Sequence, residues 1–373
     1  MKRVLLKLSA LLLTLALLFA LAVPALAGGD TFADSAYATL VTFSDCQRYG
    51  PGAYVDFGRV LNVMKNDGMP EPDSLLMGGD FTKILYDYAT PGMIQLREQY
   101  LHVYPQGDPD DIICVQGNHD NKVAGFYPTG MYDLGTYCLF LMNEDDFPWK
   151  QGSNTSSKEA TVKATAQQLE TAIDAMIAAN DLRPVIVLTH VPLHHTTRNS
   201  SADNLYASYI FSVLNRAAEK LDVIYLFGHN HSDNYDDYIG GSVNYLAPGD
   251  MIRIPTPENP GEDGYTEETL RFTYTNCGYI GNSENTLSDT STNVLTLGAI
   301  RLFANKIVFL KYTEDGLYRS ETVQRVHTAT ASEVSTPTEA KEMQRNNPAF
   351  WEFELKMLVP LVRLIIQVFG LYQ

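Results

Sequence analysis

Five short apolar runs in this sequence each end in side chains that can bind a metal ion. Asp45 follows the first run, Gly79-Asp80 the second, Asn118-His119-Asp120 the third, His190 the fourth and His229-Asn230-His231 the fifth. One aspartate after a strand often only caps a helix, and one histidine is often a structural core residue. Five such endings in order indicate a shared site.

The types of donor favour a pair of divalent ions. Two carboxylates, one carboxamide oxygen and three imidazoles exceed what a four-coordinate structural zinc site needs, and no set of thiolates accompanies them. Oxygen and nitrogen donors with a shareable carboxylate suit two adjacent ions, which can clamp a phosphoryl group during in-line displacement. The candidate ligands are Asp45, Asp80, Asn118, His190, His229 and His231.

These side chains can meet only if the runs are strands that end at one edge. The runs are rich in β-branched residues and cover 39–43, 74–77, 112–115, 185–188 and 223–227. Apolar residues at helical spacing within 158–180 and 210–217 predict helices between strands. Strands alternating with helices predict an α/β domain, and in an open sheet the carboxyl ends of the strands converge on one crevice.

Three further features complete the prediction for the domain. Val294 to Tyr312 indicates strands around the turn-like Ala304-Asn305-Lys306, which favours a hairpin. The polar segments 258–268 and 281–291 predict surface loops. Gly79, Gly117 and Gly228 allow sharp turns that point the next side chain into the site.

The two ends of the chain differ from the middle. Residues 1–27 combine a basic start, an apolar stretch and Ala25-Leu26-Ala27, which predicts a secretory signal peptide, with an uncleaved membrane anchor as the alternative. Either reading places the folded part outside the cytoplasm, secreted or at the cell surface. We expect a domain over 28–327, a linker over 328–350 and an apolar helix over 351–373. Pro360 and Arg363 disfavour a continuous span, so this helix either lies in a membrane surface or packs on the domain.

Charge and cysteine content narrow the classes of partner. The chain has 27 basic and 44 acidic residues, and losing Lys2, Arg3 and Lys7 leaves 24 against 44, a net charge of −20. Such a surface argues against nucleic acid as a partner unless bound cations reverse the sign locally. Four scattered cysteines do not form a disulfide scaffold; free buried thiols are favoured, and a bridge between Cys114 and Cys138 on neighbouring strands is the alternative.

The ordered motifs resemble those of the calcineurin-like metallophosphoesterase superfamily over most of residues 38–327. The resemblance implies a four-layer αββα sandwich, two mixed sheets flanked by helices, with a dinuclear metal centre. Asp80 is then the bridging ligand. Asp45 and His231 would hold the first ion, and Asn118, His190 and His229 the second. The ions would be manganese, zinc or iron.

One position departs from the family pattern. The first motif usually reads Asp-x-His, and Gln47 stands where the histidine is expected. A glutamine oxygen can reach a metal, but it is a poorer donor to zinc or iron than imidazole. The change predicts a first site that is weaker, that prefers manganese, or that is partly empty. Related sequences with glutamine here occur in the superfamily, so the change does not imply loss of activity.

The two-ion arrangement predicts an exported phosphoesterase that hydrolyses a small phosphate monoester or diester by attack of metal-bound hydroxide. His119 is expected to donate a proton to the leaving oxygen, with Asp120 holding its ring and raising its pKa. By resemblance His194 faces the active site, where it would touch substrate or a ligand water; the alternative is that His194 and His195 form a surface pair. Arg48 and Arg198 are candidates to meet a second phosphate or a headgroup. The alternatives are a non-catalytic metal-binding relative with a site degraded at Gln47, and a membrane-surface protein that acts mainly through 351–373.

Overall fold

The computed structural model describes most of the chain between Phe32 and Ala329. The described ranges are 32–46, 54–81, 89–120, 126–148, 156–194, 204–231, 243–255, 265–281 and 295–329. The expected signal peptide, the apolar segment 351–373 and nearly all of the expected linker lie outside them, as do Gln47, Arg48 and Arg198. Within the described residues, no helix is both long and apolar enough to cross a bilayer.

The first sheet has six strands in the order β14-β13-β12-β1-β2-β3. Its strands are β1 (Ala38–Phe43), β2 (Ser74–Met77), β3 (Ile112–Cys114), β12 (Leu297–Leu302), β13 (Lys306–Thr313) and β14 (Gly316–Gln324). β1, β2 and β3 run parallel, while β12 pairs antiparallel with β1 and begins the β12-β13-β14 meander. The predicted hairpin around Asn305 is therefore confirmed.

The second sheet also has six strands, in the order β4-β5-β6-β7-β11-β8. Its strands are β4 (Gly130–Asp133), β5 (Cys138–Met142), β6 (Val185–Thr189), β7 (Val223–Phe227), β8 (Tyr245–Leu246) and β11 (Thr273–Asn276). β5, β6, β7 and β11 run parallel, and β4 and β8 close the two edges antiparallel. Both sheets are therefore mixed.

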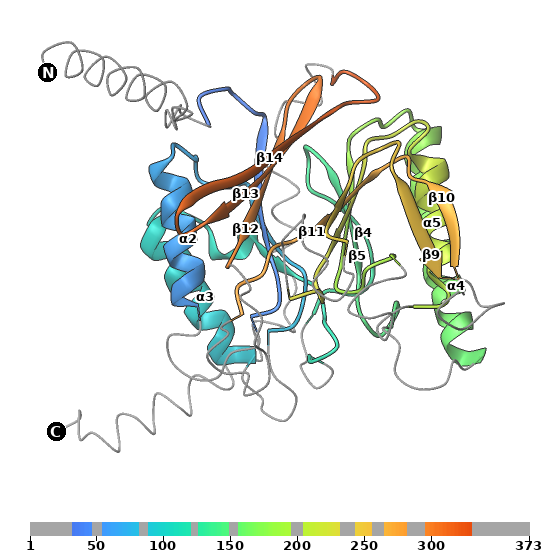
Figure 1. The fold of residues 1–373 in the computed structure, drawn as a ribbon, viewed down its shortest axis with the longest axis horizontal. Coiled ribbons are helices and arrows are strands. Elements are labelled where there is room, and N and C mark those ends of the chain that lie inside the picture. The colour runs from blue at the N-terminus through green and yellow to red at the C-terminus, as the bar shows by residue number, and fades with distance from the viewer. Residues whose placement is uncertain are drawn as a thin grey trace, which may run out of the picture.

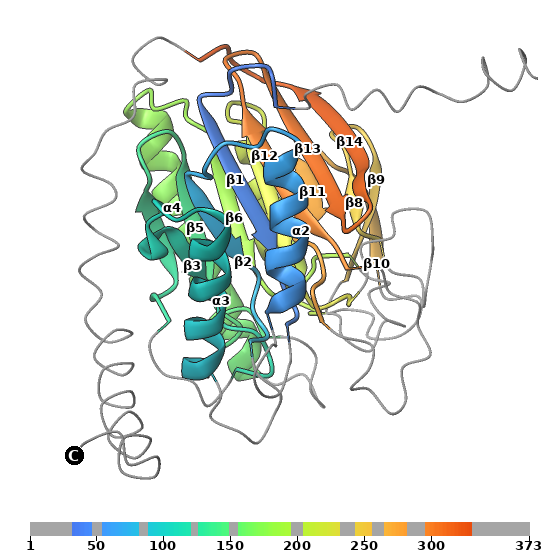
Figure 2. The same cartoon turned by 90° about the vertical axis from the view of Figure 1, so that its left-hand side faces the viewer.

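Helices cover the outer face of each sheet, which makes four layers (Figure 1). α2 (Val55–Asn66) and α3 (Ala89–Val103) lie on the first sheet, in front of it in Figure 2, and α4 (Ser156–Ala178) and α5 (Ala207–Ala217) lie on the second. A ribbon of β9 (Met251–Pro255) and β10 (Tyr265–Thr269) packs beside α5, and a short 3₁₀ turn (Pro109–Asp111) precedes β3. The expected αββα sandwich of two mixed sheets flanked by helices is confirmed.

Alternation along the strands explains the layers. On β1, Val41 and Phe43 face the core under α2 and α3, while Leu40 lies in the core between the sheets. On β7, Tyr225 faces the core under α4 and α5, while Leu226 lies between the sheets. Because both faces of these strands are buried, their sequences are continuous apolar runs.

Two expectations need correction. Part of the predicted loop 258–268 is strand β10, which pairs with β9 from Tyr265 to Thr269 although most of its side chains are exposed. Cys114 and Cys138 do not lie on neighbouring strands, because β3 belongs to the first sheet and β5 to the second, and they face different cores. All four cysteines are free and buried, as the favoured reading expected.

Candidate metal centre

The six candidate ligands follow strands from both sheets. Asp45, Asp80 and Asn118 come after β1, β2 and β3 of the first sheet, and His190, His229 and His231 come after β6 and β7 of the second. The six side chains thus lie where the carboxyl ends of strands from both sheets meet, whereas the strand pattern of the sequence suggested a single sheet. His190 joins them directly, because its Nδ1 lies 2.7 Å from the carbonyl oxygen of Gly78.

Three donor atoms form a compact triangle. Asn118 Oδ1 lies 2.9 Å from His190 Nε2 and 2.9 Å from His229 Nδ1, and the two ring nitrogens are 3.1 Å apart. Ligand atoms that bind one ion at about 2.1 Å and at right angles are about 3 Å apart. All three side chains are buried. This triangle therefore fits one face of the coordination shell of a single divalent ion.

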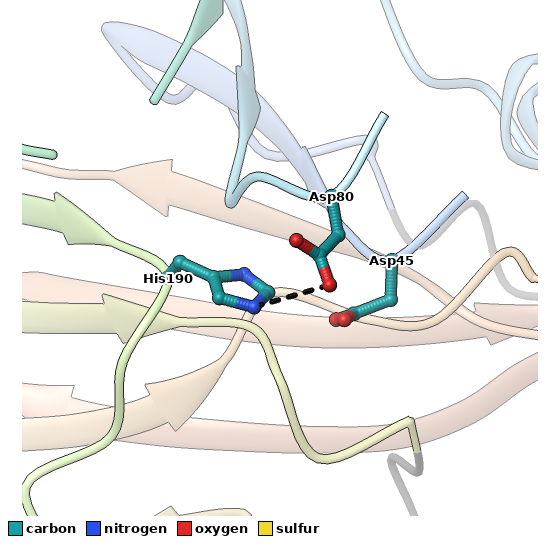
Figure 3. A group of neighbouring side chains, drawn as sticks. All are labelled: Asp45, Asp80 and His190. Atoms are coloured by element: carbon teal, nitrogen blue, oxygen red, sulfur yellow. Dashed lines mark ion pairs between the residues drawn. The ribbon is translucent and has the colours of Figure 1, made fainter. Parts of the chain in front are cut away.

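The two carboxylates lie beside this triangle. Asp80 Oδ2 is 3.3 Å from His190 Nε2, and Asp45 Oδ1 is 3.2 Å from His231 Nε2. One ligand atom each of Asp45, Asp80 and His190 lie within 4.8 Å of one another, and Figure 3 shows the three side chains turned toward a common point. Two buried carboxylates this close need cations nearby, because burial and like charge both disfavour the ionised pair. The donors therefore fit a second divalent ion, with Asp80 placed to contact both.

The pKa values show which groups supply that positive charge without metal. Burial alone would raise the pKa of Asp45, but His231 and His190 outweigh it and lower the pKa to about 2. Burial disfavours a charged His190, yet Asp80 and Asp45 raise its pKa to about 10. His190 therefore carries positive charge that a divalent cation can replace.

His119 and Asp120 differ from the expectation. Asp120 Oδ2 accepts hydrogen bonds from the backbone amides of Asp80 (2.7 Å) and Gly117 (2.9 Å), so it fixes the turn that carries the ligands. His119 Nε2 lies 3.8 Å from Asp80 Oδ2, and its side chain is 21% exposed. Burial lowers the pKa of His119, so the expected increase is wrong. His119 thus lies on the accessible side of the cluster and is mainly neutral near pH 7.

The backbone is strained where the ligands attach. Asp45, Asp80, His229 and His231 have φ values of 56°, 59°, 70° and 52°, and Asn180 is the one other non-glycine residue with positive φ in the described part of the chain. This conformation costs an L-residue roughly 1–2 kcal/mol. Such strain gathers at functional sites, where the surrounding structure compensates for it.

Glycines allow the turns to approach one another. Gly79 has a φ of 86°, and a Cβ there would lie 2.8 Å from the Cα of Gly117. A Cβ on Gly117 would overlap Oδ1 and the backbone nitrogen of Asp80. The second and third turns can therefore touch only without side chains at these positions.

The role of His194, another predicted site residue, stays a prediction. His194 is buried, and its backbone amide donates to the hydroxyl of Tyr274, 3.3 Å away. Gln47, Arg48 and Arg198 lie outside the described residues, so their roles stay predictions.

Two neighbours of the cluster were not foreseen from the sequence. The Ser44 hydroxyl donates to Asp45 Oδ2, which also accepts from the backbone amide of His229 at 2.9 Å. The ring of Tyr279 stacks on His231. A hydroxyl beside a ligand and an aromatic residue after β11 belong to no metal-binding pattern, so sequence spacing could not single them out.

Comparison with known proteins gives one family match. A family model described as calcineurin-like phosphoesterase matches residues 38–233. No curated protein matches the chain.

Three solved structures are similar to this chain at low sequence identity. A dimetal phosphatase from Danio rerio is 10% identical, with 78% of this chain and 99% of that chain covered and a TM-score of 0.45. GAP50, described as the anchor in the inner membrane complex of Plasmodium, is 13% identical over 83% and 94% of the two chains, with a TM-score of 0.44. A Vps29 single mutant from Entamoeba histolytica is 11% identical over 77% and 98%, with a TM-score of 0.29.

Proposed function

This chain belongs to the calcineurin-like phosphoesterase family, and we propose that it hydrolyses a phosphate monoester or diester at a centre of two divalent metal ions. The observation that carries the proposal is the donor geometry. Asn118, His190 and His229 form a triangle of the size that one ion needs, and Asp45 faces His231 beside it. Asp80 lies between the two groups.

Each residue has a defined task in this proposal. Asn118, His190 and His229 would hold one ion, Asp45 and His231 would hold the other, and Asp80 would be shared by them. When bound, two such ions activate water for attack and neutralise charge on the phosphoryl oxygens. The protein keeps the donors in place through Asp120, which anchors the Asp80 and Gly117 amides, and through the Gly78 carbonyl, which orients His190.

His119 is proposed to act on the leaving group. Its side chain is more exposed than that of His231, 21% against 11%, and its Nε2 lies 3.8 Å from Asp80 Oδ2. Because burial lowers its pKa, its imidazolium form is scarce at neutral pH but is a stronger acid. In that form it can give a proton to the departing oxygen.

Gln47 supports a second candidate function, a metal-binding protein without turnover. If the first site is weak, only one ion stays bound. The second ion, which would share Asp80 with it, is then missing. His119 argues against this candidate, because binding alone needs no partly exposed imidazole beside the ligands. Bound metal without hydrolysis would distinguish the two.

Export is part of the proposal. It is supported by the basic start, apolar stretch and small-residue site within residues 1–27. Protein recovered from outside the producing cells is expected to have residue 28 as its amino terminus, as measured by amino-terminal sequencing. Recovery of the intact chain inside the cytoplasm would contradict export while leaving the activity open.

The activity itself is tested by removing and restoring metal. We expect chelated protein to lose hydrolysis of a chromogenic phosphate monoester or diester and to regain it with Mn²⁺, Zn²⁺, Fe²⁺ or Mg²⁺. Asp80→Asn, which changes only the charge of that side chain, should stay folded but should recover little activity when metal is restored. Folded, metal-loaded protein that cleaves neither ester would refute the proposal.

A further inference from the structure

The residues after β11, Cys277 to Gly281, run along the end of β1 and tie the two sheets together. β11 belongs to the second sheet and β1 to the first. The Thr42 hydroxyl donates to the Cys277 carbonyl at 2.7 Å, and the Ser44 hydroxyl oxygen lies 3.0 Å from the Gly278 carbonyl oxygen. The Ile280 amide donates to the Ser44 carbonyl at 3.3 Å. The 277–281 segment is therefore held against the strand end that carries Asp45.

Tyr279 lies in the middle of this segment and is fixed on both backbone sides. Its amide donates to the Thr296 hydroxyl at 3.1 Å, and its carbonyl accepts from the Thr296 amide at 2.8 Å. Gly278 has a φ of 110°, and a Cβ there would lie 2.6 Å from the Thr296 carbonyl oxygen. Tyr279 itself is 5% exposed. Its ring is thus a rigid part of the structure.

The ring of Tyr279 lies against His231, and Gly281 separates it from the backbone of Asp45. It stacks on the His231 imidazole with centroids 5.5 Å apart and planes 19° apart. Gly281 fits between the ring and the first strand: a Cβ there would lie 2.7 Å from Tyr279 ring atoms and 2.7 Å from the Asp45 carbonyl oxygen. A backbone carbonyl orients His190, whereas here an aromatic face contacts the imidazole.

We propose that Tyr279 is the positioning residue of the Asp45–His231 metal site: stacking holds the imidazole with Nε2 toward Asp45 Oδ1 and so sets the affinity of this site. The inference rests on the proposed metal centre. Tyr279 acts through His231 and contacts no ion. Because neighbours that orient a ligand typically contribute 10–100-fold to metal affinity, we expect an effect of about tenfold. The Asn118–His190–His229 site should be unaffected.

Calorimetric titration of the metal-free protein with Mn²⁺ tests this. Wild-type protein is expected to bind two ions. Tyr279→Phe keeps the ring and should retain both affinities, whereas Tyr279→Leu should weaken one site about tenfold and leave the other within about twofold. Phe32→Leu is the control, because Phe32 is similarly buried and stacks on Tyr312 away from the cluster. It should bind both ions as wild type does.

Two further measurements separate positioning from general destabilisation. In a double-mutant cycle, Tyr279→Leu should add no loss of affinity once His231→Ala is present, because the ring acts through that imidazole. In metal-free protein, the ring protons of His231 should move downfield in the NMR spectrum of Tyr279→Leu, because the aromatic face that shields them is gone. Tyr279→Phe should leave them in place.

Several results would overturn the inference. They are unchanged affinities in Tyr279→Leu, equal weakening of both sites, and the same weakening in Phe32→Leu or Tyr279→Phe. The outcome is separable from that of the proposed function. If wild-type protein binds two ions and Tyr279→Leu binds them with the same affinities, only the role of Tyr279 is refuted. If Tyr279→Leu weakens one site selectively but wild-type protein hydrolyses no ester, only the phosphoesterase activity is refuted.

Discussion

His190 shows how single side chains prepare the site for cations. Its Nδ1 faces the Gly78 carbonyl, while Nε2 faces Asn118, His229 and Asp80. Hydrogen bonding at Nδ1 fixes the ring, so Nε2 is the nitrogen available to an ion. Without ions, Asp80 and Asp45 keep that nitrogen protonated despite burial, with a pKa of about 10.

This competition predicts that metal affinity rises with pH. Below the pKa of His190 an incoming ion must displace a proton, so binding should tighten from about pH 6 to about pH 9, by up to about tenfold per unit for one released proton. Titration calorimetry in buffers of different ionisation enthalpy measures the released protons directly. Affinity that is independent of pH, without proton release, would contradict the assignment of His190 as a ligand.

Asn118 and His119 are adjacent, but replacing them should have different effects: the first substitution should lower metal affinity and the second should lower kcat. Asn118→Ala removes one corner of the donor triangle, so metal affinity should fall by at least about tenfold. His119→Ala should keep both ions and lower kcat by about 10²–10⁴-fold, the range for a lost general acid. His102→Ala, an exposed histidine on α3, is the control for both. Equal loss of metal in the two site variants would show that His119 is a ligand instead.

At the scale of elements, the site depends on turns that touch without side chains. Gly117→Ala would push a methyl group into Asp80, so we expect a loss of about 1–3 kcal/mol in unfolding free energy together with weaker metal binding. Gly130→Ala in β4 is the control, since the nearest neighbour of an added Cβ is the side-chain amide nitrogen of Gln168 at 3.3 Å. Denaturant unfolding and metal titration report the two effects. Normal metal binding by Gly117→Ala would mean that Asp80 has room to move.

The hydrophobic pattern of the sequence was sufficient to predict strand bounds where a strand is buried on both faces. β2 and β7 have the predicted bounds because their apolar runs are bordered by polar or glycine residues. It failed for β10, whose Thr266, Glu267 and Glu268 are exposed and whose order comes from pairing with β9. Tyr279 could not be foreseen either, because its contact with His231 joins segments that follow different strands.

At the scale of the whole molecule, the two sheets are joined at both ends. At the end away from the cluster, Arg325 after β14 pairs with Asp222 before β7 at 2.7 Å and donates to the Tyr37 hydroxyl at 2.9 Å. The side chains of Arg325 and Asp222 are 1% and 5% exposed. The resemblance predicted the two sheets, but no local pattern marks this pair, because its partners are about a hundred residues apart.

Breaking this pair should destabilise the fold without altering the metal centre. Arg325→Met leaves a buried carboxylate without its cation, which typically costs about 3–5 kcal/mol. Arg325→Met with Asp222→Leu removes both charges and should recover much of that loss. Chemical unfolding measures the stability and metal titration the site. A single variant as stable as wild type would show that the pair does not hold the sheets together.

We expect six side chains from two sheets to enclose two divalent ions. Anomalous diffraction from crystals of the Mn²⁺-loaded protein tests it most directly. We predict two peaks about 3.5–4 Å apart, one beside Asn118, His190 and His229 and one beside Asp45 and His231, with Asp80 between them. No peak at this cluster, or one peak bound by other residues, would contradict the account.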